Sequence, residues 1–498
     1  MEHADAAQVS ALVGALGAAL VFLVRGRALP LAGFALLGLA TAGLMSSLVP
    51  DEDLRLLVTT REGIALLCAG ATATVLAAIP LVRYPHAVPV VLLAVAPFRI
   101  PVELGSEEAF LLLPLYFALA AAVVALAYRM IRGERTTPPP LLLALPLTAF
   151  VALASASFLW TWDERSGGIA LAFFVFPFTA ALATVARAPL APWLPRALLL
   201  TLVALGSLFA AIGIWQAQTR TLFFARDVAV ANAYTTFFRV TSLFKDPSLY
   251  GRYLVIPIVV VLVAILFRRG RSLEWLALAG VIALLVWGLD FSYSQSSFVA
   301  LFVATFALAL AAAGPRLRLV LLVGALLAML AAVAYTAHAV EGRSARDVTS
   351  GRSRLVSVTL DAFQARPLAG VGIGGQPRAS TEESGRGSPS RNASHTTPLT
   401  VLAELGVAGL AVFLWLVAAA AVVVVRVVRV ERALGIGLAA VLSVLLVHSL
   451  LYAGLFEDPL TWGALGVASL ALSASGATVR VGLAGAENTG NAPQLLAH

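Results

Sequence analysis

Charge and cysteine are both scarce in this chain of 498 residues. Only 12% of the residues are charged, whereas 60% are hydrophobic, and the mean hydropathy is +0.94. This composition excludes a water-soluble globular fold. The single cysteine, Cys68, excludes disulfide bonds within the chain and metal sites built from several thiolates. Lysine also occurs only once, at Lys245, so nearly all of the positive charge is arginine.

Long apolar runs fill most of the sequence. Runs of about 18–24 residues recur along the chain, and each can cross a hydrocarbon core of roughly 30 Å as a helix. They are continuous rather than alternating, which favours helices over a transmembrane β-barrel. About fifteen such runs can be drawn. We therefore predict an all-α fold, a polytopic transmembrane helix bundle of about 12–15 spans with two long extracytoplasmic loops.

Basic and acidic residues alternate along this series of spans. Arginine clusters follow every second span, for example at 25–27, 129–135 and 426–432, whereas the intervening loops are acidic. By the positive-inside rule the arginine-rich side faces the cytoplasm, and the N-terminus faces the outside. The net charge of +8 is therefore a result of topology, and no nucleic-acid partner is expected.

The hydropathy and charge patterns divide the chain into six segments. We expect N-terminal transmembrane helices over 1–216, an extracytoplasmic loop over 217–246, transmembrane helices over 247–340, a large extracytoplasmic loop over 341–397, C-terminal transmembrane helices over 398–478, and a disordered cytoplasmic tail over 479–498. No internal repeat is evident, which argues against a transporter built from two related halves.

Two outer segments carry cations that the positive-inside rule does not explain. The stretch "RVTSLFKDPSLYGRYL" holds Arg239, Lys245 and Arg252 where the first outer loop returns to the membrane. The stretch "SGRSRL" places Arg352 and Arg354 near the start of the second outer loop. A guanidinium group binds two phosphate oxygens at once and stays charged at any working pH. These arginines therefore indicate a pocket for an anionic group.

A histidine and a glutamate flank the start of a later span, in "RNASHTTPLTVLAELGVAGL". Thr397 and Pro398 predict a helix start, and its weakly positive N-terminus lies beside His395. Glu404 lies within the span, where a charge costs about 2.5–3.5 kcal/mol at the bilayer centre. No metal or other cofactor is expected, because no cluster has metal-ligand spacing and "GVGIGG" lacks the strand and helix of a dinucleotide fingerprint.

Three motifs taken together resemble a known family. In order they are "R..S.F.DPS....YL", "GR.........AF...PLAGVGIGG" and "SHT..L..LAELGVAGL", over residues 235–415. This order is similar to that of the O-antigen ligase and Wzy-type polymerase superfamily of bacterial envelope glycosyltransferases. The resemblance implies a multi-pass protein of the inner membrane that transfers a glycan from undecaprenyl pyrophosphate to a lipid or glycan acceptor at the periplasmic face. It implies neither metal nor nucleotide.

The resemblance also implies roles for individual residues. Arg239 and Arg352 would bind the pyrophosphate, and His395 would orient or deprotonate the acceptor hydroxyl. Possible auxiliary groups are Lys245, Arg252, Arg354 and Glu404. The family usually has glycine where this chain has a serine at position 242.

Three other readings stay open at this point. A Wzy-type polymerase of O-antigen or exopolysaccharide repeat units would use the same motifs as the favoured ligase. A transporter or flippase of a lipid-linked anion would need functional charges near the bilayer midplane, for which Arg99, Asp290 and His448 are candidates besides Glu404. A non-catalytic assembly scaffold would tolerate the loss of His395. Membrane lipids are expected partners in every case.

Overall fold

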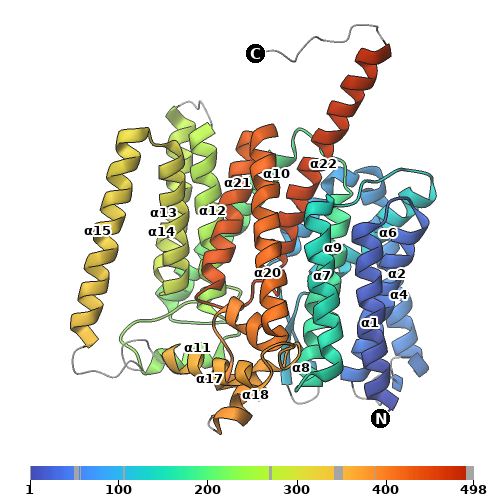
Figure 1. Cartoon of the computed structure of the whole chain (residues 1–498), viewed down its shortest axis with the longest axis horizontal. Coiled ribbons are helices and arrows are strands. Elements are labelled where there is room, and N and C mark those ends of the chain that lie inside the picture. Colours follow the sequence, from blue (N-terminus) through green and yellow to red (C-terminus); the bar gives the residue numbers. More distant parts are fainter. Residues whose placement is uncertain are drawn as a thin grey trace.

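The computed structural model describes residues 2–49, 55–56, 58–104, 107–267, 272–340, 352–385 and 387–488. Over these residues the chain is a bundle of long helices that run side by side (Figure 1). Twelve helices of the described part are long and apolar enough to cross a membrane. The predicted all-α transmembrane bundle is therefore confirmed.

The N-terminal half contains the following elements: α1 (Glu2–Leu23), α2 (Ala28–Leu48), α4 (Arg61–Arg83), η1 (Pro85–Ala87), α5 (Val88–Val95), β1 (Ile100–Leu104), β2 (Glu107–Leu111), α6 (Leu113–Ile131), α7 (Leu141–Ser157), η2 (Phe158–Trp160), α8 (Glu164–Ile169), the π-helical η3 (Ala170–Val175), α9 (Phe176–Ala186) and α10 (Leu194–Thr219). The strands form an antiparallel hairpin in which Ile100 pairs with Leu111 and Leu104 with Glu107. This hairpin is an addition to the predicted fold.

The C-terminal half contains α11 (Arg226–Ala233), α12 (Pro247–Phe267), α13 (Ser272–Asp290), α14 (Gln295–Ala312), α15 (Pro315–Val340), α17 (Arg352–Ala365), α18 (Gln376–Ser384), α19 (Pro389–Asn392), α20 (Thr397–Val430), α21 (Arg432–Ser449) and α22 (Pro459–Asn488). The short helices α11, α17 and α18 come from the two predicted outer loops. They lie together at one end of the bundle, with α8 (Figure 1).

The two ends of the bundle differ in composition. We call the end that carries α8, α11, α17 and α18 the loop end, and it is also where α1 begins (Figure 1). We call the opposite end, where α10 and α21 begin, the basic end, because Arg27, Arg132, Arg196 and Arg432 lie at helix termini there. By the positive-inside rule, the basic end is the predicted cytoplasmic end.

The long helix α20 is interrupted at Gly406, which has φ +67° and ψ −165°. This backbone conformation is essentially restricted to glycine. The glycine-rich segment 369–375 docks at the interruption, where Val371 N–H donates to the Ala403 carbonyl at 2.9 Å and Gly372 N–H to the Glu404 carbonyl at 2.9 Å. This part of the predicted second outer loop is therefore packed into the bundle.

The same segment also contacts the N-terminal half of the chain. The Trp162 N–H donates to the Val371 carbonyl at 3.0 Å, and the Thr161 hydroxyl donates to the Ile373 carbonyl at 2.8 Å. A Cβ added to Gly372 would lie 2.3 Å from the Thr161 Cα, so the two backbones approach too closely for any side chain. The second outer loop is thus held between α20 and the α7–α8 connection.

Candidate functional site

His395 lies at the loop end, two residues before α20 begins. Thr396 has an extended backbone and precedes the helix, so Thr396, rather than Thr397, is the N-cap residue. The Thr396 hydroxyl donates to the Leu450 carbonyl at 3.2 Å, which joins the start of α20 to the end of α21. Because the first turn of a helix leaves backbone N–H groups unpaired, His395 stands beside a weakly positive helix end.

A buried glutamine positions the segment that precedes His395. Gln376 is 1% exposed and begins α18. Its side-chain oxygen accepts from the Ser394 N–H at 2.9 Å. Its amide nitrogen donates to the Asn392 carbonyl at 3.0 Å and to the Ser380 hydroxyl at 2.7 Å. Sequence reasoning did not single out Gln376, because a glutamine near a polar loop carries no distinctive signal.

Arg352 and His395 lie within electrostatic range of each other. Burial lowers the pKa of His395 below its ordinary value, the Arg352 guanidinium lowers it further, and the Asp246 carboxylate opposes this change. The His395 side chain still reaches solvent, so a substrate can approach it. Burial and Arg352 thus favour the neutral imidazole, which is the form that accepts a proton.

Arg239 is fixed at another point of the loop end. Asn232 of α11 accepts from the Arg239 N–H at 3.0 Å and donates to the Arg239 carbonyl at 2.9 Å. The Arg239 Nε donates to the Ser292 carbonyl at 3.2 Å, in the turn between α13 and α14. Within the described part of the chain, no hydrogen bond links Arg239 to His395 or Arg352. Of the three predicted residues, Arg352 and His395 therefore interact electrostatically, whereas Arg239 has other partners.

Ser242 occupies a strained position just beyond Arg239. Its φ of +53° lies in the left-handed region that glycine adopts more readily, which accounts for the glycine usual at this point of the motif. The side chain of Gln216 holds the serine there, accepting from the Ser242 N–H at 2.7 Å and donating to the Ser242 carbonyl at 2.9 Å. The Ser242 hydroxyl donates to the Phe209 carbonyl at 3.0 Å.

Two of the auxiliary cations have different surroundings. Arg354 donates to the Asn392 side-chain oxygen at 2.8 Å and to the Arg391 carbonyl at 3.0 Å. It therefore joins α17 to the segment that carries His395. Lys245 is exposed at the loop end, next to Asp246.

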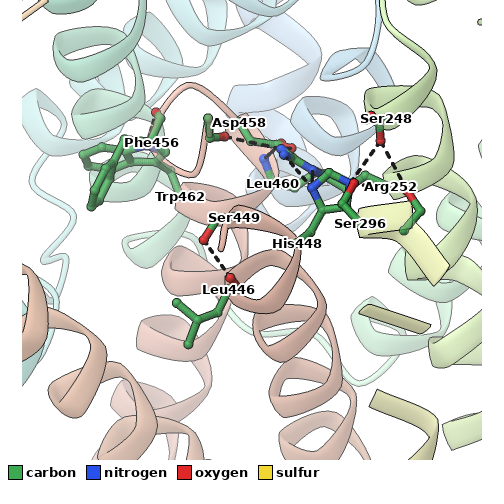
Figure 2. Close-up of polar contacts among 12 residues, drawn as sticks. Ser248, Arg252, Ser296, Leu446, His448, Ser449, Phe456, Asp458, Leu460 and Trp462 are labelled. Atoms are coloured by element: carbon green, nitrogen blue, oxygen red, sulfur yellow. Dashed lines mark hydrogen bonds and ion pairs between the residues drawn. The ribbon is translucent and has the colours of Figure 1, made fainter. Parts of the chain in front are cut away.

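Arg252, another auxiliary candidate, is buried in the bundle and already paired. It lies in α12, is 1% exposed, and places Nη1 2.6 Å from the Asp458 Oδ2. Its Nε and Nη2 lie 3.2 and 3.0 Å from the His448 Nδ1 (Figure 2). Because a guanidinium only donates, Nδ1 is the acceptor and the neutral His448 carries its proton on Nε2. From the sequence, His448 is a candidate for a charge near the bilayer midplane, whereas nothing there singles out Asp458.

The other side of His448 faces a group of serines. Its Nε2 lies 3.1 Å from the Ser248 carbonyl, 3.1 Å from the Ser296 hydroxyl and 3.3 Å from the Ser297 hydroxyl. Figure 2 shows Ser248 and Ser296 on the side of His448 away from Asp458. The network spans α12, α14, α21 and the start of α22, so it fixes the relative positions of four helices below the loop end.

Tyr452 lies between His395 and this buried network. Its ring centroid is 6.2 Å from that of His395 and 5.7 Å from that of His448, and the Arg252 guanidinium carbon is 5.8 Å from it. The Tyr452 side chain hydrogen-bonds to Asp246, and burial together with the Asp246 charge raises the pKa of its hydroxyl. Tyr452 therefore connects the exposed histidine to the buried arginine.

Glu404 faces a small cavity of about 100 Å³ that Thr400 and Glu457 also line. Its carboxyl group receives hydrogen bonds from the backbone of Gly374 and Gln376. Burial raises the pKa of Glu457 above its ordinary value. Glu404 therefore joins α20 to the glycine-rich segment.

The arginines, histidines and tyrosine at the loop end suit recognition of an anionic phosphate and transfer of a proton. Among the described residues, no group of three or more His, Cys, Asp or Glu side chains is placed to hold a metal ion.

Comparison with known proteins supports the same family. Residues 280–414 match a family model described as O-Antigen ligase. A search of curated proteins found no match to the chain. The matched residues include Arg352, His395 and Glu404, whereas Arg239, Tyr452 and Asp458 lie outside them. With twelve candidate membrane spans among its described residues, the chain is therefore a multi-pass membrane protein whose residues 280–414 resemble the O-antigen ligase family.

Proposed function

We propose that this protein transfers a glycan from undecaprenyl pyrophosphate to an acceptor hydroxyl at the periplasmic face of the inner membrane. The observation that carries the proposal is the solvent-reaching His395 at the loop end, whose pKa the Arg352 guanidinium lowers. The match over residues 280–414 supports a membrane glycosyltransferase of this general type.

The proposed reaction is a single displacement at the sugar. The acceptor oxygen bonds to the anomeric carbon while the bond between that carbon and the pyrophosphate oxygen breaks. Undecaprenyl pyrophosphate leaves with the electron pair, and the acceptor proton passes to His395. Arg352 and Arg239 bind the pyrophosphate, whose negative charge grows as the bond breaks, so fixed cations stabilise the transition state more than the ground state.

The auxiliary candidates differ in exposure. Lys245 is exposed at the loop end, Arg252 is buried with Asp458 and His448, and Arg354 donates to Asn392. In this proposal Arg252 and Arg354 position the site, and Lys245 adds positive charge near its entrance.

An assay with purified protein tests the transfer step. His395→Ala, Arg352→Ala and Arg239→Ala variants are compared with wild type for glycan transfer from a lipid-linked donor to a lipid acceptor. A general acid–base group typically contributes about 10²–10⁴-fold, so His395→Ala should lower the rate by at least that lower figure. Arg378→Ala is the matched control, because Arg378 is an exposed arginine of α18 whose ion-pair partner is the exposed Glu382. Unchanged transfer in all three variants would reject the proposal.

A ligase and a polymerase differ only in the acceptor, and we favour the ligase. Deletion of the gene should then leave full-length glycan chains on the carrier lipid. Loss of chain length with single repeat units on the carrier would instead assign the polymerase function. The readout is the size distribution of the carrier-linked glycans.

A further inference from the structure

A second, larger cavity lies far from His395, in the half of the bundle next to the basic end. Its volume is about 410 Å³. The walls come mainly from α5, α10, α12, α21 and α22, and Leu93, Leu202, Val263 and Val467 are representative of the lining. Cavities that bind small molecules occupy roughly 300–1,000 Å³ and are mostly apolar. This cavity therefore has the size and the surface of a binding site for a hydrocarbon chain.

The cavity has a cationic rim at the basic end. Arg196 in the first turn of α10 lines it and is exposed. Arg432 begins α21, is exposed, and places its guanidinium carbon 5.7 Å from the ring centroid of Phe267, which also lines the cavity. Two guanidinium groups at one rim provide a binding place for a phosphate.

The other end of the cavity lies below the Arg252 network. Leu460 lines the cavity, and its N–H donates to the Asp458 Oδ1 at 2.9 Å (Figure 2). Asp458 in turn pairs with Arg252 through its other oxygen. The cavity therefore runs between the arginine rim and the base of the candidate site.

The helices around this cavity are not closely packed. A Cβ added to Gly437 of α21 or Gly463 of α22 would meet no atom within 4 Å, and both glycines line the cavity. By contrast, a Cβ on Gly435, two residues before Gly437, would lie 2.4 Å from the Val428 backbone nitrogen. Protein interiors are normally close-packed, so such space among packed helices indicates room for an occupant.

We propose that the cavity binds one acyl chain of an anionic phospholipid from the membrane leaflet at the basic end, with its phosphate between Arg196 and Arg432. The apolar walls accept hydrocarbon and exclude a glycan. The paired guanidinium groups favour a headgroup with net negative charge over a zwitterionic one. The cytoplasmic leaflet, which the basic end is predicted to face, supplies such lipids.

The test uses the full-length protein, delipidated in detergent, and a phosphatidylglycerol whose acyl chain ends in a photoactivatable diazirine. Cross-links should map to peptides of α10, α12, α21 or α22. Gly437→Leu and Gly463→Leu fill the cavity from two different helices, and each should lower labelling at least tenfold. Gly280→Leu is the matched control, because Gly280 is an exposed helical glycine with nothing within 4 Å of an added Cβ. The control should label like wild type, and gel filtration checks the folding of each variant.

Competition identifies the ligand. Unlabelled phosphatidylglycerol should compete at least tenfold better than phosphatidylcholine with the same chains, and Arg196→Ala with Arg432→Ala should abolish that preference. Equal labelling of a folded cavity-filling variant and Gly280→Leu would overturn the proposal. Stronger competition by undecaprenyl phosphate than by phosphatidylglycerol would also overturn it, because the cavity would then hold a prenyl chain.

Discussion

Asp246 and Arg352 act on the imidazole of His395 in opposite directions. A general base must be unprotonated, so activity should fall as the pH falls through the His395 pKa. Arg352 lowers that pKa, and Arg352→Gln should therefore move the acid limb of the pH–rate profile to higher pH. Asp246 raises it, and Asp246→Asn should move the limb to lower pH. The measurement is kcat/KM against pH for each variant. Arg378→Gln should leave the limb in place, and shifts of the two test variants in one direction would contradict the assignment.

The buried pair of Arg252 and Asp458 gives a stability prediction. Asp458→Asn keeps the shape of the side chain but leaves the Arg252 charge without a counter-ion, which should cost about 3–5 kcal/mol of unfolding free energy. Replacement of both partners, by Arg252→Met with Asp458→Leu, removes the charge and should be less destabilising than Asp458→Asn alone. Thermal unfolding of the purified variants measures both effects. A double variant that unfolds earlier than the single one would refute this account.

Residue type revealed part of the site, and the fold was needed for the rest. His395 and Arg352 could be proposed because the positive-inside rule does not explain arginines at an outer re-entry point and because both residues lie in motifs that resemble the family. The partners of Arg252 could not be proposed, because His448 and Asp458 lie 196 and 206 residues away along the chain. Arg252 and Arg239 look equivalent in the sequence, and only burial shows that one of them is already neutralised.

The interruption of α20 depends on Gly406. Gly406→Ala should destabilise the protein by more than about 2 kcal/mol, because alanine disfavours this backbone conformation and its Cβ would lie 2.2 Å from the Leu368 carbonyl oxygen. Gly280→Ala, in an open helical position, should instead be neutral or stabilise by up to about 1 kcal/mol. Thermal unfolding compares the two variants. Equal unfolding temperatures for Gly406→Ala and Gly280→Ala would contradict the claim that a side chain strains the backbone at position 406.

Whole helices were easier to predict than their interruptions. A continuous apolar run of sufficient length has few alternatives to a spanning helix, so the bundle followed from hydropathy alone. The interruption at Gly406 was not predicted, because the run "LAELGVAGL" continues the helical pattern on both sides of it. The docking partner of that interruption, residues 369–375, is set by backbone hydrogen bonds, which leave no trace in side-chain periodicity.

For the molecule as a whole, the single cysteine allows a direct test of orientation. In a Cys68→Ser background, Glu382→Cys places a thiol on exposed α18 at the loop end, and Arg316→Cys places one at the start of α15. A membrane-impermeant maleimide added to intact spheroplasts should label position 382 and not position 316. The reverse pattern would put the loop end in the cytoplasm and would contradict the periplasmic site. Labelling after lysis controls for reactivity at both positions.

Charge alternation predicted which loops share an end, because short connections force successive helices to run in opposite directions. The locations of the two cavities were beyond sequence reasoning, since each is bounded by helices from both halves of the chain.

The hydrogen bonds from Thr161 and Trp162 to the segment at Val371 have a consequence for protein engineering and for evolution. A recombination event that exchanges residues 280–414 alone would separate that segment from the α7–α8 connection with which it interlocks. A functional chimera should therefore need the α7–α8 region from the same parent as residues 280–414. Chimeras that exchange only residues 280–414 are expected to fail. Chimeras whose breakpoint lies upstream of α7 are expected to function.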